Sequence, residues 1–113
     1  MQINLLEETK AVLADNGKTM DDIIYICSED YRIPISDFEL LADVNYDNGF
    51  GGQEILPDLK LCGANFWLER YEYDGSEWWE YKTMPAIPEK IKILTSLLQY
   101  RQYDNENTEE NYL

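Results

Sequence analysis

The first sixteen residues have the apolar spacing of an amphipathic helix. Asn4 is a suitable N-cap, and Glu7 follows three residues later, as in an Asx version of the capping box. The apolar side chains that would face a core are Leu5, Leu6, Val12 and Leu13. Asn16-Gly17 is a typical helix stop. We therefore predict a helix over residues 4–16.

Two further short elements are predicted between residues 22 and 43. β-Branched and aromatic side chains cluster at 23–27, which favours a strand over 22–28, followed by a turn at Ser28-Glu29-Asp30. Pro34 then disfavours a helix before Ser36. The sequence Ser36-Asp-Phe-Glu39 has the form of a capping box, which predicts a helix over 36–43.

The middle of the chain has weaker patterns. Residues 45–53 contain three glycines and two asparagines, which is typical of a loop. Residues 55–62 are predicted to form a strand. Pro57 confines that strand to an edge of a sheet or splits it, because proline has no N–H to donate.

The clearest pattern lies between residues 65 and 83. Two aromatic-rich runs flank Asp74-Gly75-Ser76, which predicts a β-hairpin. Its register stays open between a two-residue turn, which pairs Tyr71 with Trp78, and a three-residue loop, which pairs Tyr71 with Trp79. The three-residue loop also places Arg70 opposite Glu80, and this cross-strand ion pair favours it. In both registers the two faces of the hairpin have aromatic rings, so the hairpin is covered on both sides or exposes a patch of rings.

The C-terminal part follows Pro85 and Pro88. Apolar residues at helical spacing favour a helix over 89–101, with a short strand as the alternative because Ile91-Ile93-Thr95 alternates. The acidic tail 104–113 is expected to fray. Taken together, the chain is predicted to be a single domain, 1–113. Its expected fold is α+β, with a small antiparallel sheet built on the 65–83 hairpin and two or three helices packed against it.

The net charge of the chain and its lack of His exclude several classes of function. The 113 residues include 23 Asp and Glu against 9 Lys and Arg, a net charge of −14, and no His. Such acidity argues against direct binding to nucleic acid or to an anionic membrane. The lack of His removes His-based triads, His general bases and His metal ligands. No nucleophile motif or phosphate-binding loop is present, so the chain is expected to be no enzyme and to hold no cofactor.

The two cysteines indicate the compartment. Cys27 and Cys62 lie in apolar surroundings without a CxxC motif, so buried free thiols in a reducing cytoplasm are expected, with a disulfide as the alternative. No apolar run approaches the ~18 residues of a membrane span. The start MQINLLEETK is polar and charged, unlike a signal peptide. A cytoplasmic location is therefore expected.

Most of the negative charge is concentrated in one segment. Residues 21–58 contain ten acids against one base, Arg32, for a net charge of −9. The proposed partner-binding acids are Asp21, Asp22, Glu29, Asp30, Asp37, Glu39, Asp43, Asp47, Glu54 and Asp58. Aromatic side chains beside them are expected to supply apolar anchors: Tyr31, Phe38, Tyr46 and Phe50. Duplex DNA presents one negative charge per ~1.7 Å of axis, so this segment approaches the charge density of DNA. A surface that only keeps the protein in solution is the alternative interpretation.

The 43–54 segment also resembles the spacing of an EF-hand loop. Asp43, Asn45, Asp47 and Glu54 stand at positions 1, 3, 5 and 12 of that pattern, with Phe50 at the apolar position 8. Position 6 is Asn rather than Gly, and Pro57 excludes an exit helix. A calcium-binding or regulatory module is therefore the alternative function.

Three stretches point to a source for the protein. The MQINLLEETK start, the DNGFGGQE segment and the YDGSEWWEY hairpin resemble small acidic proteins carried by phages and mobile elements of Gram-positive bacteria. In size and charge the chain is similar to anti-CRISPR inhibitors, several of which occupy the nucleic-acid groove of an RNA-guided nuclease. The resemblance implies an anti-defence inhibitor that mimics the charge of DNA. The partner would be a protein with a basic nucleic-acid-binding surface, such as an RNA-guided CRISPR nuclease.

Overall fold

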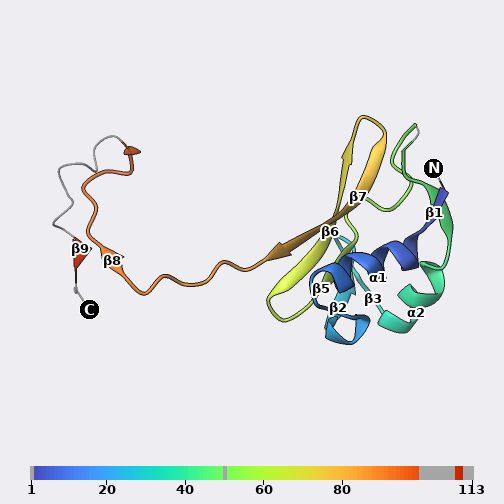
Figure 1. Ribbon diagram of the computed structural model, residues 1–113, viewed down its shortest axis with the longest axis horizontal. Coiled ribbons are helices and arrows are strands. Elements are labelled where there is room, and N and C mark those ends of the chain that lie inside the picture. The colour runs from blue at the N-terminus through green and yellow to red at the C-terminus, as the bar shows by residue number, and fades with distance from the viewer. Residues whose placement is uncertain (1, 50, 100–108, 111–113) are drawn as a thin grey trace.

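The computed structural model describes residues 2–49, 51–99 and 109–110. Five antiparallel strands form the main sheet in the order β3-β2-β5-β6-β7 (Figure 1). These strands are β2 (Tyr25–Cys27), β3 (Arg32–Ile33), β5 (Lys60–Cys62), β6 (Phe66–Tyr73) and β7 (Ser76–Thr83). The predicted α+β fold, with a small antiparallel sheet that includes the hairpin, is confirmed.

Helix α1 (Leu5–Asp15) covers one face of the sheet and follows the prediction closely. The side chain of Asn4 accepts a hydrogen bond from the Glu7 N–H at 3.0 Å, so the predicted cap is formed. At the other end, Gly17 has a φ of +72°, a value that favours glycine and ends the helix. Leu5 and Leu13 are buried against the sheet.

Helix α2 (Ile35–Leu41) begins one residue earlier than predicted. Pro34 occupies the N-cap position and offers no side-chain hydrogen bond, so the predicted Ser36 capping box is not formed. Proline suits this place because its fixed φ, here −57°, leads the chain into the helix and its missing N–H is not needed there. The helix buries Phe38, and Ala42 behind its last turn is also buried.

Three predicted segments are corrected in the structure. The 45–53 loop begins with a strand, β4 (Asn45–Asp47), which pairs with β1 (Gln2–Asn4). The strand predicted over 55–62 shortens to β5, because Pro57 interrupts the run and the Ile55 N–H is bonded to a side chain. The strand predicted over 22–28 shortens to β2 and follows a 3₁₀ helix, η1 (Met20–Asp22).

The predicted hairpin is confirmed as β6 and β7, but the favoured register is wrong. Tyr73 pairs with Ser76 across a two-residue turn, so Tyr71 lies opposite Trp78 and Arg70 lies opposite Trp79. Asp74 and Gly75 have φ values of +52° and +85°, as a type I′ turn requires. The right-handed twist of that turn matches the twist of the strands. It outweighs the surface ion pair on which the three-residue register depended.

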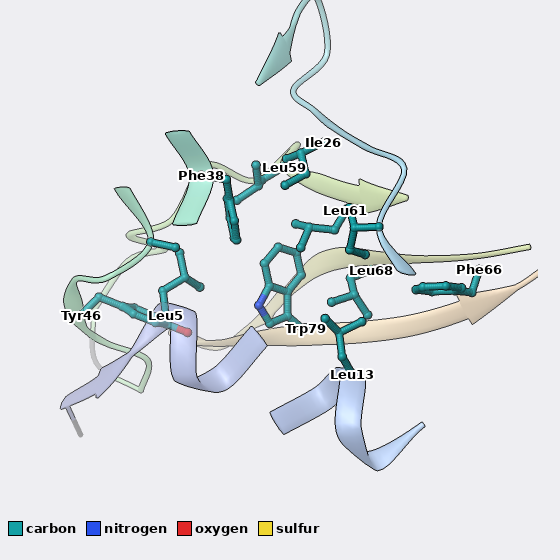
Figure 2. Close-up of a cluster of buried hydrophobic side chains, with 12 residues drawn as sticks. Leu5, Leu13, Ile26, Phe38, Tyr46, Leu59, Leu61, Phe66, Leu68 and Trp79 are labelled. Carbon is teal, nitrogen blue, oxygen red and sulfur yellow. The ribbon is translucent and has the colours of Figure 1, made fainter. Parts of the chain in front are cut away.

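Trp79 lies at the centre of the core between the sheet and α1 (Figure 2). Its side chain is 5% exposed, and its indole N–H donates to Thr9 Oγ1 at 2.9 Å. Leu61 and Leu68 pack on the same face of the sheet and are fully buried. Strand alternation turns Trp78 to the outer face, where it is half-buried beside the exposed Tyr71. The hairpin is therefore covered on one face and exposes rings on the other.

The chain after β7 is extended. Strand β8 (Ile91–Lys92) pairs with β9 (Glu109–Glu110), and no α-helix occurs over the described residues 84–99, so the helix predicted over 89–101 is wrong. Strand β8 agrees with the alternative of a short strand in this segment. Two prolines and β-branched residues at 91 and 93 favour extended backbone here. Apart from Glu109–Glu110, the tail predicted to fray, 104–113, lies outside the described residues.

Candidate functional site

The ten acids of the 21–58 segment lie at the surface, spread over several elements. Eight of them are exposed, and Asp47 and Asp58 are half-buried. They come from η1, the β2–β3 turn, α2, β4 and the segment that leads into β5. By their partners they divide into two groups of five: acids that bond locally, and acids that do not.

The first group stabilises local structure. Asp22 accepts the Thr19 N–H at 2.8 Å and caps η1. Asp58 accepts both the Ser28 hydroxyl and the Glu29 N–H, each at 2.9 Å. The hydrogen bonds from Glu29 and Ser28 hold the pKa of Asp58 below its ordinary value. These acids therefore stabilise the local structure of the chain.

The acids of the second group do not stabilise local structure through side-chain bonds to other described residues. Within the part of the chain that the structure describes, its members make no hydrogen bond or ion pair through their carboxylates: Asp21, Glu29, Asp30, Asp37 and Glu39. The one base of the segment, Arg32, lies over the ring of Tyr25 at 5.8 Å, outside any ion pair of the described residues. This group, called the free acids below, is available to an external cation.

An apolar pocket lies within the same segment. It has a volume of about 230 Å³ and opens between α2 and residues 54–59. Phe38, Leu41, Val44 and Leu56 are among the residues that line it. Among the described residues that line it, Glu54 is the one with a charge, so the pocket is apolar with one acidic residue. We call this feature the α2 pocket.

Exposed leucines accompany the α2 pocket. Leu40 is 79% exposed and Leu41 is 72% exposed, because α2 turns Phe38 and Ala42 inward and leaves its two leucines outside. Contiguous apolar surface of this kind marks interaction sites in water-soluble domains. The sequence pattern contains the signal: Leu40-Leu41-Ala42 is a wider apolar run than a seven-residue helix with one buried face needs.

The predicted aromatic anchors are corrected. Tyr46 is 4% exposed and Phe38 is 3% exposed, so both are core residues, whereas Tyr31 lies at the surface. In β4 the side chains alternate, and the pairing with β1 turns Tyr46 inward, where its hydroxyl donates to Glu8 at 2.6 Å. Burial and this hydrogen bond raise the pKa of Tyr46 well above its ordinary value. Phe50 lies outside the described residues.

The residues of the proposed calcium loop do not gather around a common centre. Asn45 and Asp47 lie in an extended strand, and the Asn4 amide donates to Asp43 at 2.9 Å and to Asn45 at 3.3 Å. Glu54 accepts the Asp47 N–H at 3.4 Å. Among the described residues, no group of three or more His, Cys, Asp or Glu has a metal-binding arrangement. An EF-hand needs a turning loop, which β4 replaces.

A buried ion pair was missed by the sequence analysis. Arg70 and Glu77 have fully buried side chains and meet at 2.7 Å, and the guanidinium also donates to the Tyr46 hydroxyl at 2.9 Å. Among the described residues, its Nε and Nη1 atoms have no hydrogen-bond partner, but Nη1 lies 3.6 Å from a Glu8 carboxylate oxygen and the guanidinium lies 4.7 Å from the Trp79 ring. Glu77 in turn accepts the N–H groups of Glu54 at 2.5 Å and Ile55 at 3.3 Å. The pair therefore holds one wall of the α2 pocket against the hairpin.

The two cysteines of the chain do not form a disulfide. Cys27 and Cys62 are free thiols, as predicted, although they are half-buried rather than buried. Burial and the neighbouring Cys62 raise the pKa of the Cys27 thiol. No helix of the described ranges is long and apolar enough to cross a membrane.

No protein-family model, curated protein or solved structure matches the chain.

Proposed function

We propose that the protein is a non-enzymatic, acidic interaction protein that binds a basic surface of another protein. The observation that supports this function best is the set of free acids. A carboxylate with no internal partner keeps its full capacity to pair with Lys or Arg of a partner, and its charge speeds the encounter. The exposed leucines beside them supply the apolar contact that charge alone lacks.

More specifically, the basic surface is the nucleic-acid-binding groove of a defence nuclease in the bacterial cytoplasm, such as an RNA-guided CRISPR nuclease. A groove built for phosphates presents rows of Lys and Arg. The 21–58 segment is complementary to such a groove, because it has a net charge of −9 and contains one basic residue, Arg32. The resemblance to small acidic phage proteins agrees with this role. The protein would act by excluding nucleic acid from the groove.

The test is a binding measurement with a purified RNA-guided nuclease. The variant Glu29→Lys with Glu39→Lys reverses two free acids, and we expect about tenfold weaker binding at low salt. The matched control is Glu7→Lys with Asp15→Lys, two exposed acids of α1 without side-chain partners among the described residues. The control should change affinity by less than about twofold. Both variants should keep the thermal midpoint, because the four positions are exposed.

Two further measurements decide the mechanism. Binding of the wild-type protein should weaken as salt rises, because salt screens the charges of both surfaces. Guide-matched DNA in excess should displace the protein from the nuclease. If the nuclease holds DNA and this protein together, the groove-blocking mechanism is wrong. If both pairs of reversals act alike, the acidity serves solubility alone.

A further inference from the structure

The segment that follows β7 exposes an unusual number of large apolar side chains. Within residues 84–99, here called the arm, Ile87 is 91% exposed and Leu97 is 90% exposed. The other exposed apolar residues of the arm are Met84, Ile91, Ile93, Leu94 and Leu98. β8 pairs with β9 through its backbone, yet the arm's apolar side chains stay in solvent. A protein seldom leaves a contiguous apolar surface like this without a partner.

The sign of its charge separates the arm from the rest of the chain. Residues 84–99 contain Lys90 and Lys92 against Glu89, a net charge of +1. Since the whole chain sums to −14, everything outside the arm carries −15. The arm is thus apolar and weakly basic, attached to a strongly acidic body.

The α2 pocket has the complementary properties. It is apolar, its one charged lining residue is Glu54, and Asp43 stands between two of its lining residues in the sequence, Ala42 and Val44. A cavity of about 230 Å³ is large enough for one branched or aromatic side chain. Apolar and charge complementarity therefore pair the arm with the α2 pocket.

The arm does not reach the pocket of its own molecule. In Figure 1 the arm leaves the end of β7 on the side of the body away from α2 and runs outward. A pocket on a second molecule is free of that restriction. We propose that two copies of the chain exchange arms, with the arm of each docked in the α2 pocket of the other. This dimer depends on the arm and the α2 pocket and not on the free acids, although Leu41 belongs both to the pocket and to the apolar contact of the proposed function. The sedimentation test below contains no nuclease, so its outcome is separate from the test of that function.

The first test is the oligomeric state of full-length variants by sedimentation. Wild type should be a dimer at micromolar concentrations. Ile87→Gln with Leu97→Gln replaces the two most exposed apolar side chains of the arm, either of which could fill the pocket, and Leu41→Gln removes one pocket contact; each variant should weaken dimerisation at least about tenfold. The matched control is Leu40→Gln on the same helix, because Leu40 is as exposed as Leu41 but does not line the pocket. It should leave the dimer unchanged.

The second test mixes the two defective proteins. The arm variant keeps an intact pocket and the Leu41→Gln variant keeps an intact arm, so an equimolar mixture should regain a heterodimer with one complete contact. A dimer formed by any other pair of surfaces would gain nothing from mixing. All positions changed are exposed, and an unchanged circular dichroism spectrum checks the fold. A wild-type monomer up to about 100 μM, or no recovery on mixing, overturns the proposal.

Discussion

The β6–β7 hairpin and the 21–58 segment are both rich in carboxylates, but they use them differently. In the hairpin, Glu69 accepts the Trp67 indole N–H at 2.8 Å, and Glu80 accepts that of Trp78 at 2.9 Å. Glu77 is paired with Arg70 in the core. In the 21–58 segment, half of the acids have no such partner among the described residues.

This difference distinguishes structural charge from available charge. Glu69 and Glu80 each bond to an indole two residues away, and Glu77 bonds to the core. Glu72 accepts the Gly75 N–H at 3.2 Å, so four of the five hairpin acids hold strands, rings or the turn in place. The carboxylates of the free acids make no hydrogen bond or ion pair within the described residues, although Asp21 and Asp37 lie in the first turns of η1 and α2. Under the proposed function, these acids form the surface that binds a basic partner. The predictions below test both halves of this comparison, beginning with the largest effect.

The largest effect is expected at Trp79. Trp79→Ala should lower the free energy of unfolding by about 3–5 kcal/mol, because it empties the centre of the core. It also leaves Thr9 without its indole donor and uncovers the Arg70 guanidinium. Urea unfolding measures the change. Trp78→Ala is the control from the outer face and should cost less than half as much. Equal losses would contradict the assignment of the two faces.

The buried ion pair comes next. Glu77→Gln should cost about 3 kcal/mol in the free energy of unfolding, because the buried Arg70 charge loses its closest counter-charge and keeps only Glu8, 3.6 Å from its Nη1 atom. The control is Glu69→Gln on the outer face of β6, which should cost less than about 1 kcal/mol. If the two variants have the same stability, the Arg70–Glu77 pair is no more important than a surface contact. Urea unfolding at neutral pH compares them.

The elements that sequence alone predicted well are those coded by neighbouring residues. The α1 cap depends on Asn4 and Glu7, and the hairpin depends on Asp74-Gly75 between aromatic runs. The register was missed because the prediction valued one ion pair above the twist of the turn. The 89–101 helix was wrong because apolar spacing alone does not outweigh two preceding prolines and β-branched residues.

For the proposed binding surface, the sequence alone predicted the exposure of the acids but not the burial of Tyr46 or the α2 pocket. Exposure of the acids follows from the cost of burying a carboxylate, and eight of the ten acids proposed to bind a partner are exposed. Tyr46 could not be placed, because its burial depends on the pairing of β4 with β1, about forty residues away in the sequence. The α2 pocket was missed for the same reason, since its walls come from distant parts of the chain.

A smaller effect is expected at Asp58, the acid of the 21–58 segment that serves the fold most clearly. Its folded pKa is lowered, so the folded state favours the charged form, and its contribution is present above the ordinary pKa of 3.8. That contribution is lost as pH falls through the folded pKa. The stability difference between wild type and Asp58→Asn should therefore shrink between pH 6 and about pH 3. A constant difference across this range would mean that the Ser28 and Glu29 hydrogen bonds do not stabilise the charged form.

The smallest effect is expected from calcium. Asp43 and Asn45 accept hydrogen bonds from Asn4, and Glu54 accepts one from the Asp47 N–H, so these oxygens do not form a preorganised calcium site. Millimolar CaCl₂ should move the thermal midpoint by less than about 1 °C relative to MgCl₂ at the same ionic strength, because only specific binding adds stability by linkage. The control variant, Asp43→Asn with Glu54→Gln, should respond to the two salts as wild type does. A calcium-specific rise in wild type that this variant abolishes would show that the 43–54 segment rearranges into a binding loop. The 21–58 segment would then hold its acids for a metal ion rather than for a basic protein.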